Sequence, residues 1–310
     1  MNKLIVSSSP HILSKNSIQR IMLDVIIALM PALVAAIIFF GHRALVITIV
    51  SVAAAVLTEA VLQKLCKKPV TVNDLSAVVS GILIAFNLPV SVPLWMPVVG
   101  SVFAMALVKF VFGGLGHNFM NPALAARALL TVSWPARMAG AVWTQPGNID
   151  VIGIATPLEL LKAGENLPGI YDLFMGNVAG CLGETSALAL LIGGIYLLLR
   201  GVINWRTPVT FIGSVALISW IFGVNPLYSI LAGGLMLGAL FMATDYATAP
   251  VTPKGQLIMG VGCGVITTFI RLFGGYPEGV SYSILFMNVM TPLIDKFTMP
   301  KKFGGVKTHA

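Results

Sequence analysis

The sequence predicts an all-α polytopic membrane protein, and both its composition and its apolar runs support this prediction. Hydrophobic residues make up 57% of the 310 residues, charged residues only 10%, and the mean hydropathy is +0.93. A soluble domain carries roughly 25% charged residues. Because a membrane helix needs about 20 mostly apolar residues, the chain has room for about ten spans and their loops. The net charge of +8 does not indicate nucleic-acid binding, since the basic residues lie at the ends of apolar runs.

Ten apolar runs are expected to form membrane helices, bounded by charged residues, glycine turns or prolines. They cover residues 21–40, 44–65, 75–86, 94–112, 122–136, 188–199, 209–222, 227–242, 256–273 and 282–297. The third run has about twelve apolar residues, which is too short to cross a bilayer alone. It ends at Asn87-Leu88-Pro89, so we expect a broken helix there.

A weak internal repeat divides the chain into two halves. Residues 80–85 resemble residues 233–238, and residues 109–114 resemble residues 271–275. Five helices in each half make the halves run in opposite directions, an inverted repeat typical of transporters. We therefore expect a site where the broken third span meets its partner around the eighth span. The predicted divisions are a cytoplasmic tail (1–20), a first membrane repeat (21–138), an extracytoplasmic loop (139–178), a second membrane repeat (179–298) and a cytoplasmic tail (299–310).

The basic residues indicate the orientation. With ten spans and a cytoplasmic N-terminus, most of the 19 Lys and Arg residues fall on the cytoplasmic side. The exceptions are Arg43, Arg127, Arg137, Lys162 and Arg271. This asymmetry predicts that both termini are cytoplasmic and that Thr185 lies near the outer face.

Four carboxylates lie in or near apolar runs, namely Asp24, Glu59, Asp74 and Asp245. Intramembrane carboxylates are costly and usually face a cavity, a partner or an ion path. One interpretation places all four at interfacial depth near the cytoplasmic face. The other makes them a path for a cation. Neither is excluded by the sequence.

Polar residues around the fifth span are candidates for anion binding. Asn121-Pro122 is a favourable helix start, and a helix N-terminus with Asn118 and Asn121 either binds an anion or is a capped turn. Arg127 lies about two turns into this helix, where its guanidinium would hold a phosphate or anionic ring, or pair with a carboxylate. The spacing of Cys66, Cys181 and Cys263 does not predict a metal site.

A short polar stretch, Gly183-Glu184-Thr185-Ser186-Ala187, precedes the sixth run. Thr or Ser here can cap the helix by accepting a backbone N–H, and Glu184 favours its positive end. A hydroxyl at the membrane boundary is also open to covalent modification, and a cap does not exclude a modified hydroxyl beside it.

Three motifs together resemble one family. Ser8-Ser9-Pro10-His11, the stretch 116–123 that contains Asn118 and Asn121, and the stretch 183–187 resemble the D component of the Rnf electron-transport complex. The chain is also similar to the B component of the sodium-pumping NADH:quinone reductase. The resemblance implies FMN joined through its phosphate to Thr185, attached outside the cytoplasm by a flavin transferase. It also implies a second, non-covalent flavin, riboflavin, among the spans. Glu184, Asn118, Asn121 and Arg127 are the other candidates for contact with a cofactor.

The resemblance also implies a function and partners. The expected protein is a flavoprotein subunit, inactive alone, of a translocase that moves electrons between ferredoxin and NAD and transports sodium or protons across the bacterial cytoplasmic (inner) membrane. Expected partners are other membrane subunits, an extracytoplasmic FMN-bearing subunit and cytoplasmic iron–sulfur subunits. Two alternatives remain, a channel or transporter for a small polar solute such as urea, and a scaffold for the other subunits.

Overall fold

The computed structural model describes residues 17–140, 142–275 and 278–300. The Ser8-Ser9-Pro10-His11 motif and most of the two predicted tails lie outside the described residues. Within the described residues the fold is all-α apart from one hairpin. The described part contains 14 helices: α1 (Ile18–Phe40), α2 (His42–Leu65), α3 (Ser76–Phe86), α4 (Trp95–Phe103), α5 (Pro122–Ser133), α6 (Pro135–Met138), α7 (Pro157–Ala163), α8 (Ile170–Met175), α9 (Ala187–Leu199), α10 (Arg206–Ile221), α11 (Pro226–Leu231), α12 (Leu235–Leu237), α13 (Pro253–Phe273) and α14 (Val280–Thr298).

Three further short helical segments and a small hairpin complete the described structure. Segment η1 (Val72–Asp74) is a 3₁₀ turn, whereas η2 (Ala104–Phe110) and η3 (Gly238–Met242) are π-helical and continue α4 and α12. Strands β1 (Thr144–Gln145) and β2 (Asn148–Ile152) pair antiparallel. The hairpin, α7 and α8 lie in the long loop predicted at 139–178.

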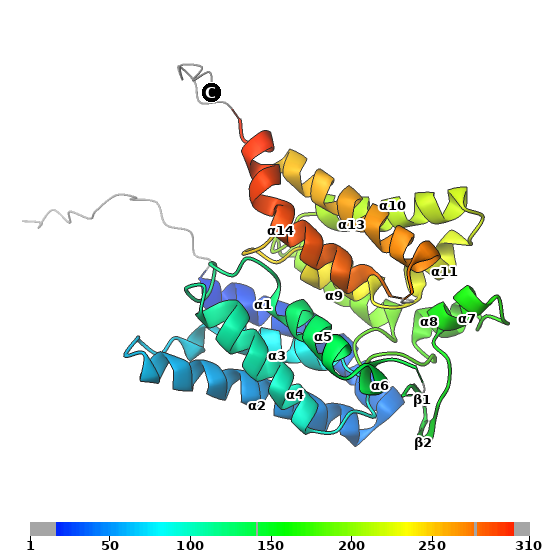
Figure 1. Cartoon of the computed structure of the whole chain (residues 1–310), viewed down its shortest axis with the longest axis horizontal. Coiled ribbons are helices and arrows are strands. Elements are labelled where there is room, and N and C mark those ends of the chain that lie inside the picture. The colour runs from blue at the N-terminus through cyan, green and yellow to red at the C-terminus, as the bar shows by residue number, and fades with distance from the viewer. Residues whose placement is uncertain (1–16, 141, 276–277, 301–310) are drawn as a thin grey trace, which may run out of the picture.

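The helices form two groups that lie one above the other in Figure 1. Helices α1 to α5 form the first group, and α9 to α14 form the second. Contacts between α1 and α9 and between α5 and α14 join the two groups. The main core continues across this boundary, because buried residues from both groups, such as Phe86, Leu190 and Leu240, belong to one cluster.

Only some of the helices can cross a membrane unaided. Among the described residues, α1, α2 and α13, with 23, 24 and 21 residues, are long and apolar enough. Five shorter apolar helical stretches have 10 to 17 residues. A bilayer core requires about 20 residues of helix. The ten predicted runs all contain helix, but several of these helices need the adjoining loop segments to complete a crossing.

Two helical segments break inside the protein, as the sequence predicted for the third run. Helix α3 ends at Phe86, and the side-chain amide of its C-cap Asn87 donates to the Leu83 carbonyl at 2.6 Å. Helix α11 ends at Leu231 with Ala232 as its C-cap, and Gly233 then adopts a positive φ of 69° before α12 begins. Carbonyls freed at such breaks need donors, because no water reaches them in a bilayer core.

Arginines provide donors at both breaks. Arg43 donates to the carbonyls of Ser91 and Val92 at 3.4 and 3.1 Å, in the loop that follows α3. Arg271 donates to the carbonyls of Ser229 and Ala232 at 2.6 and 3.2 Å, at the end of α11. The breaks are therefore supported by side chains from neighbouring helices.

The molecule has two distinct ends. Ile18 at the start of α1 and Met299 after α14 line one cavity, so the described chain begins and finishes at the same end, which we call the terminal end. At the opposite end, the Gly147 N–H of the β1–β2 hairpin donates to the Phe39 carbonyl of α1 at 2.8 Å. We call this the loop end (Figure 1).

Candidate functional site

Arg127 is the centre of a buried ionic cluster. It lies in α5, whose first turn is capped by the Asn121 side chain with Pro122 at the first helical position, and its residue exposure is 7%. Its Nη1 lies 2.5 Å from Glu184 Oε1 and donates to Asn87 Oδ1 at 2.8 Å. Its Nη2 pairs with Glu278 Oε2. We call Asn87, Arg127, Glu184 and Glu278 the arginine cluster. A carboxylate pair, one of the two interpretations of Arg127, is therefore the arrangement observed.

Close backbone contact explains how Glu184 reaches the break after α3. The Leu182 N–H donates to the Leu88 carbonyl at 3.1 Å, and the Gly183 N–H donates to the Phe86 carbonyl at 3.0 Å. A Cβ at Gly183 would overlap the Cβ and ring of Phe86. Only glycine therefore fits at this position without movement of the α3 end.

Thr185 lies next to the arginine cluster but is deeply buried. Its residue exposure is 2%, and the cap of α9 belongs to its neighbour Ser186, whose hydroxyl accepts from the Ala189 N–H at 3.3 Å. Thr185 lines a small cavity together with Glu184, Glu278 and Thr156. Thr156 is partly exposed and caps α7, where it forms a reciprocal capping box with Glu159. Two threonine hydroxyl groups thus lie at one cavity, with different access to solvent.

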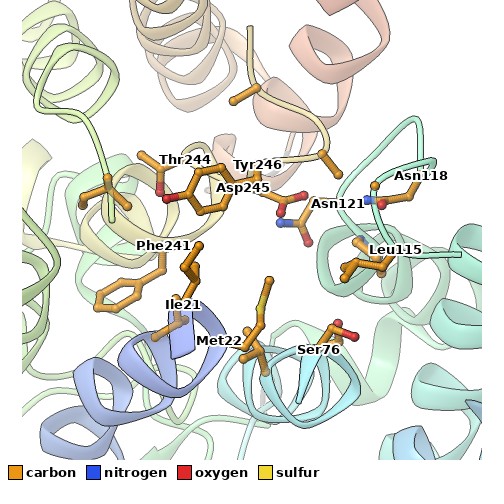
Figure 2. A pocket seen from close by; sticks show the side chains of 18 of the residues that line it. Ile21, Met22, Ser76, Leu115, Asn118, Asn121, Phe241, Thr244, Asp245 and Tyr246 are labelled. Carbon is orange, nitrogen blue, oxygen red and sulfur yellow. The ribbon is translucent and has the colours of Figure 1, made fainter. Parts of the chain in front are cut away.

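A much larger cavity, of about 1110 Å³, opens within the terminal end. Apolar side chains from α1 and η3, such as Met22 and Phe241, line it together with polar side chains (Figure 2). The labelled polar residues in that view are Ser76, Asn118, Asn121, Thr244, Asp245 and Tyr246. A volume with apolar walls and a few polar groups is typical of a site for an organic ligand.

The predicted anion-binding residues therefore divide between two places. Asn121 accepts from the N–H groups of Ala123 and Leu124 at 3.0 and 3.3 Å, and Asn118 donates to the Met120 carbonyl at 3.1 Å. Both asparagines line the large cavity, whereas Arg127 and Glu184 belong to the arginine cluster. Asn121 thus has the capping role that the sequence indicated.

The four membrane carboxylates each have a local partner. Asp24 pairs with Arg200 at 3.1 Å and accepts from the Tyr196 hydroxyl at 2.9 Å. Glu59 pairs with Lys109 at 2.7 Å.

The other two carboxylates accept hydroxyl hydrogen bonds. Asp74 accepts from the Ser76 hydroxyl at 2.5 Å, and Asp245 accepts from the Thr248 hydroxyl at 3.1 Å. Asp245 lies in the loop after η3, where desolvation raises the pKa of its carboxyl while hydrogen bonds from Thr248 and Asn118 oppose the increase.

Comparison with known proteins decides the family. The model of the NQR2, RnfD, RnfE family matches residues 5–304. The chain belongs to this family. It is 56% identical over 308 residues to the D component of the Na(+)-translocating ferredoxin:NAD(+) oxidoreductase complex of Acetobacterium woodii, across 98% of this chain and 96% of the relative.

Two further family members extend the comparison. The D component of the proton-translocating ferredoxin:NAD(+) oxidoreductase complex of Clostridium ljungdahlii is 44% identical, across 98% of this chain and 97% of its own. The D component of the ion-translocating oxidoreductase complex of Escherichia fergusonii is 36% identical, across 97% and 99%. The similarity therefore spans essentially the full length of these relatives and confirms the resemblance drawn from the three motifs.

Several residues of the arginine cluster and of the two cavities were not predicted as site residues from the sequence. Glu278 lies in a turn after α13 and offers no spacing signal, and Asn87 was identified only as part of a helix break. Lys109 was expected at a span end on the cytoplasmic side, yet it is 3% exposed and paired with Glu59. Thr156 precedes Pro157 and Glu159, and this capping-box pattern of a Thr followed three residues later by a Glu was visible in the sequence.

The carboxylates of the arginine cluster lie close to a thiol as well as to Arg127. Cys181, Glu184 and Glu278 each offer a ligand atom within 4.8 Å of one another. Arg127 pairs with both carboxylates, although its single positive charge balances only one of them, and the Cys181 thiol donates to the Asn87 carbonyl at 3.5 Å. Cys181 and Cys263 are buried, and Cys66 is exposed.

Proposed function

We propose that this chain is the membrane flavoprotein of the D type in an ion-translocating ferredoxin:NAD⁺ oxidoreductase complex. The observation that carries this proposal is 56% identity over 98% of the chain to a relative of that name. The complex couples electron transfer between ferredoxin and NAD to transport of sodium or protons, and the chain is inactive without its partners. Those partners are other membrane subunits, an extracytoplasmic FMN-bearing subunit and iron–sulfur subunits.

The covalent flavin is FMN, held by a phosphoester to a threonine at the loop end. The residue suggested by the motif is Thr185, beside Glu184. Its 2% exposure means that the loop before α9 must open before a transferase can reach the hydroxyl. The partly exposed Thr156 lines the same small cavity and requires no such opening. Thr156 is therefore a second candidate for the flavin attachment, supported by its access to solvent.

The large cavity is the proposed site of the second, non-covalent flavin. Its volume of about 1110 Å³ is ample for a ring system of that size. Apolar residues such as Ile21, Met22 and Phe241 suit the faces of a flavin ring, and Asn118 and Thr244 suit its polar edges. A bound flavin supplies one- and two-electron redox chemistry, while the protein supplies position and electrostatics.

The ion path is proposed to use the carboxylates of the terminal end, Asp24, Glu59, Asp74 and Asp245. This proposal is supported by the burial of Asp24 and Glu59, at 8% and 5% exposure, since buried carboxylates in membrane helices commonly serve ion transfer. The two breaks, after α3 and after α11, support the proposed inverted repeat. The names of the relatives include one sodium and one proton translocator, so sodium and protons are both candidate coupling ions.

The proposed location is a bacterial cytoplasmic membrane, with the terminal end in the cytoplasm. The excess of Lys and Arg at predicted cytoplasmic positions supports this orientation. It would expose the loop end, with Thr156 and Thr185 near it, to the compartment where the flavin transferase works.

Mass spectrometry of the two threonine peptides tests the flavin proposal. The complex is produced with an active flavin transferase, and peptides that contain Thr185 or Thr156 are examined in the wild type, Thr185→Ala and Thr156→Ala. We expect an FMN mass on one of the two peptides, lost only in the matching alanine variant. The Thr131→Ala variant is the control and should keep the modification. An unmodified chain, with the transferase active on another substrate, would leave the channel and scaffold alternatives.

A further inference from the structure

Lys109 is a buried lysine on the wall of the large cavity. It is 3% exposed and lies in the π-helical segment η2. Its Nζ lies 2.7 Å from Glu59 Oε1 and donates to the Ser76 hydroxyl oxygen at 2.7 Å. Lysine is almost never fully buried without a partner. Its ammonium therefore lies between two oxygen atoms inside the protein.

The oxygen atoms around this ammonium form a connected set. Ser76 donates to Asp74 Oδ1 at 2.5 Å, so Lys109 is linked through one hydroxyl to a second carboxylate. Gln63 donates to Glu59 Oε1 at 3.3 Å and to the Thr71 hydroxyl at 2.8 Å. We call Glu59, Asp74, Ser76 and Lys109 the lysine site.

One oxygen atom of this site lacks a partner. Glu59 is 5% exposed, and its Oε2 is buried without a hydrogen bond among the described residues. A buried carboxylate oxygen that accepts no hydrogen bond carries a desolvation cost. The site therefore has unused capacity to bind a cation, although its carboxylate already faces an ammonium.

We propose that the Lys109 ammonium is a tethered cation that occupies a binding site for a monovalent metal ion. Oxygen atoms of carboxylates and hydroxyl groups are the ligands preferred by hard cations. Glu59, Asp74 and Ser76 provide such oxygens, and Glu59 Oε2 provides one more that Lys109 leaves unused. The metal ion enters this site when Lys109 turns away from Glu59.

The geometry gives Lys109 a place to move. Lys109 and Ser76 both line the large cavity, which also contains the carboxylates of Asp245 and Asp295 on its wall. π-Helical turns occur frequently at functional sites. Gly113 and Gly114, with φ of 120° and 97°, follow closely after η2. The ammonium can therefore leave Glu59 for the cavity without leaving the protein.

This inference rests on the proposed ion path and on the proposed flavin in the large cavity, and it links ion binding to electron transfer. If the proposed flavin occupies the cavity, its reduction would add negative charge there, which would attract the Lys109 ammonium and leave Glu59 to the incoming ion. Reduction then favours ion binding at the lysine site, and oxidation favours the return of Lys109.

Removal of the tethered cation tests the proposal. The purified complex with Lys109→Met is heated in NaCl or in choline chloride at equal ionic strength, and the Tm of this chain is followed. We expect a saturable Tm increase in Na⁺ for Lys109→Met, because the vacated site binds the ion. Two control variants should each have the same Tm in NaCl and in choline chloride. Lys109→Arg keeps a tethered cation in the site, and the double variant Lys109→Met with Glu59→Gln lacks the carboxylate that would bind the ion. An equal Tm of Lys109→Met in both salts would overturn the proposal.

A second measurement uses the wild-type complex and does not depend on how well a variant folds. Acetic anhydride labelling of Lys109 is quantified by mass spectrometry in Na⁺ and in choline, before and after reduction. We expect the fraction labelled to increase severalfold in Na⁺ with reductant, because the ion displaces the amine into the cavity. Equal labelling in all four conditions would overturn the proposal. Flavin content is measured in the same samples, so that a flavin-free wild type would count against the proposed function instead.

Discussion

Arg127 joins three segments that are far apart in the sequence. It contacts Asn87 after α3, Glu184 before α9 and Glu278 after α13. These segments are the break that follows α3, the loop that leads into α9 and the turn that leads into α14. A buried guanidinium between two carboxylates is critical for stability, because its loss leaves both carboxylates as uncompensated buried charges.

Replacement of Arg127 by methionine should therefore destabilise the protein strongly. Removal of one partner from a buried ion pair costs about 3–5 kcal/mol, and two carboxylates lose their partner here. Thermal unfolding of the purified chain in detergent measures the change. Neutralising both carboxylates in the same chain, with Glu184→Gln and Glu278→Gln, should recover much of the stability. A triple variant as unstable as Arg127→Met would show that the cluster is not held by charge.

At the scale of elements, the loop before α9 is fitted against the end of α3. Gly183 has no space for a side chain because Phe86 lies against it, whereas a Cβ at Gly180 would meet its nearest atom, Thr185 Cγ2, at an ordinary 3.8 Å. Steric fit at one glycine thus fixes where Glu184 and Thr185 lie.

These two glycines provide a matched comparison. Gly183→Ala should lower stability by about 1–3 kcal/mol, the usual cost of overpacking, and Gly180→Ala should have little effect. Thermal unfolding of both variants, with flavin content of each, is the measurement. Equal stability of the two variants would contradict the close packing at Gly183.

The sequence predicted these elements better than their contacts. Each of the ten apolar runs contains helix, although only three of the described helices are long and apolar enough to span a membrane unaided. Asn121-Pro122 identified the start of α5, and the short third run identified the break at Asn87. The partners of Arg127 were not predictable, because Glu278 is 151 residues away in the chain. Local patterns determine helices and caps. Pairing across the core depends on how the two helix groups pack, which no local pattern encodes.

At the scale of the whole molecule, two cavities lie towards opposite ends of the structure. The large cavity lies at the terminal end, and the small cavity with Thr156 and Thr185 lies towards the loop end. Glu184 and Glu278 of the arginine cluster line the small cavity. Such an arrangement suits a protein that passes electrons from one face of a membrane towards the other.

Filling the large cavity should remove the non-covalent flavin that we propose to bind there. Met22 lines the cavity, whereas Met30 lies on the same helix with 43% exposure. We expect Met22→Trp to lower the extractable flavin of the complex severalfold, and Met30→Trp to leave it unchanged. Acid extraction followed by chromatography gives the flavin content per complex. Full flavin content in Met22→Trp would place that cofactor elsewhere.

Orientation can be tested with the native thiol groups. Cys66 is exposed at the end of α2, whereas Cys181 and Cys263 are buried. A membrane-impermeant maleimide should label Cys66 in inside-out vesicles but not in intact cells, because the terminal end is proposed to face the cytoplasm. A Cys66→Ser chain with Glu165→Cys, on the exposed loop, is the control and should show the opposite pattern. Labelling of Cys66 in intact cells would reverse the orientation.

The most direct test of the central claim is ferredoxin-driven NAD⁺ reduction by the assembled complex. The wild type is compared with a complex whose chain carries the alanine substitution at the threonine that mass spectrometry shows to be modified. With all partners present, we predict that the rate falls at least about tenfold, since a flavin on the electron path is lost and the other cofactors stay in place. An unchanged rate in a fully assembled complex without this flavin would contradict the account, because electrons would then not pass through the covalent flavin of this chain.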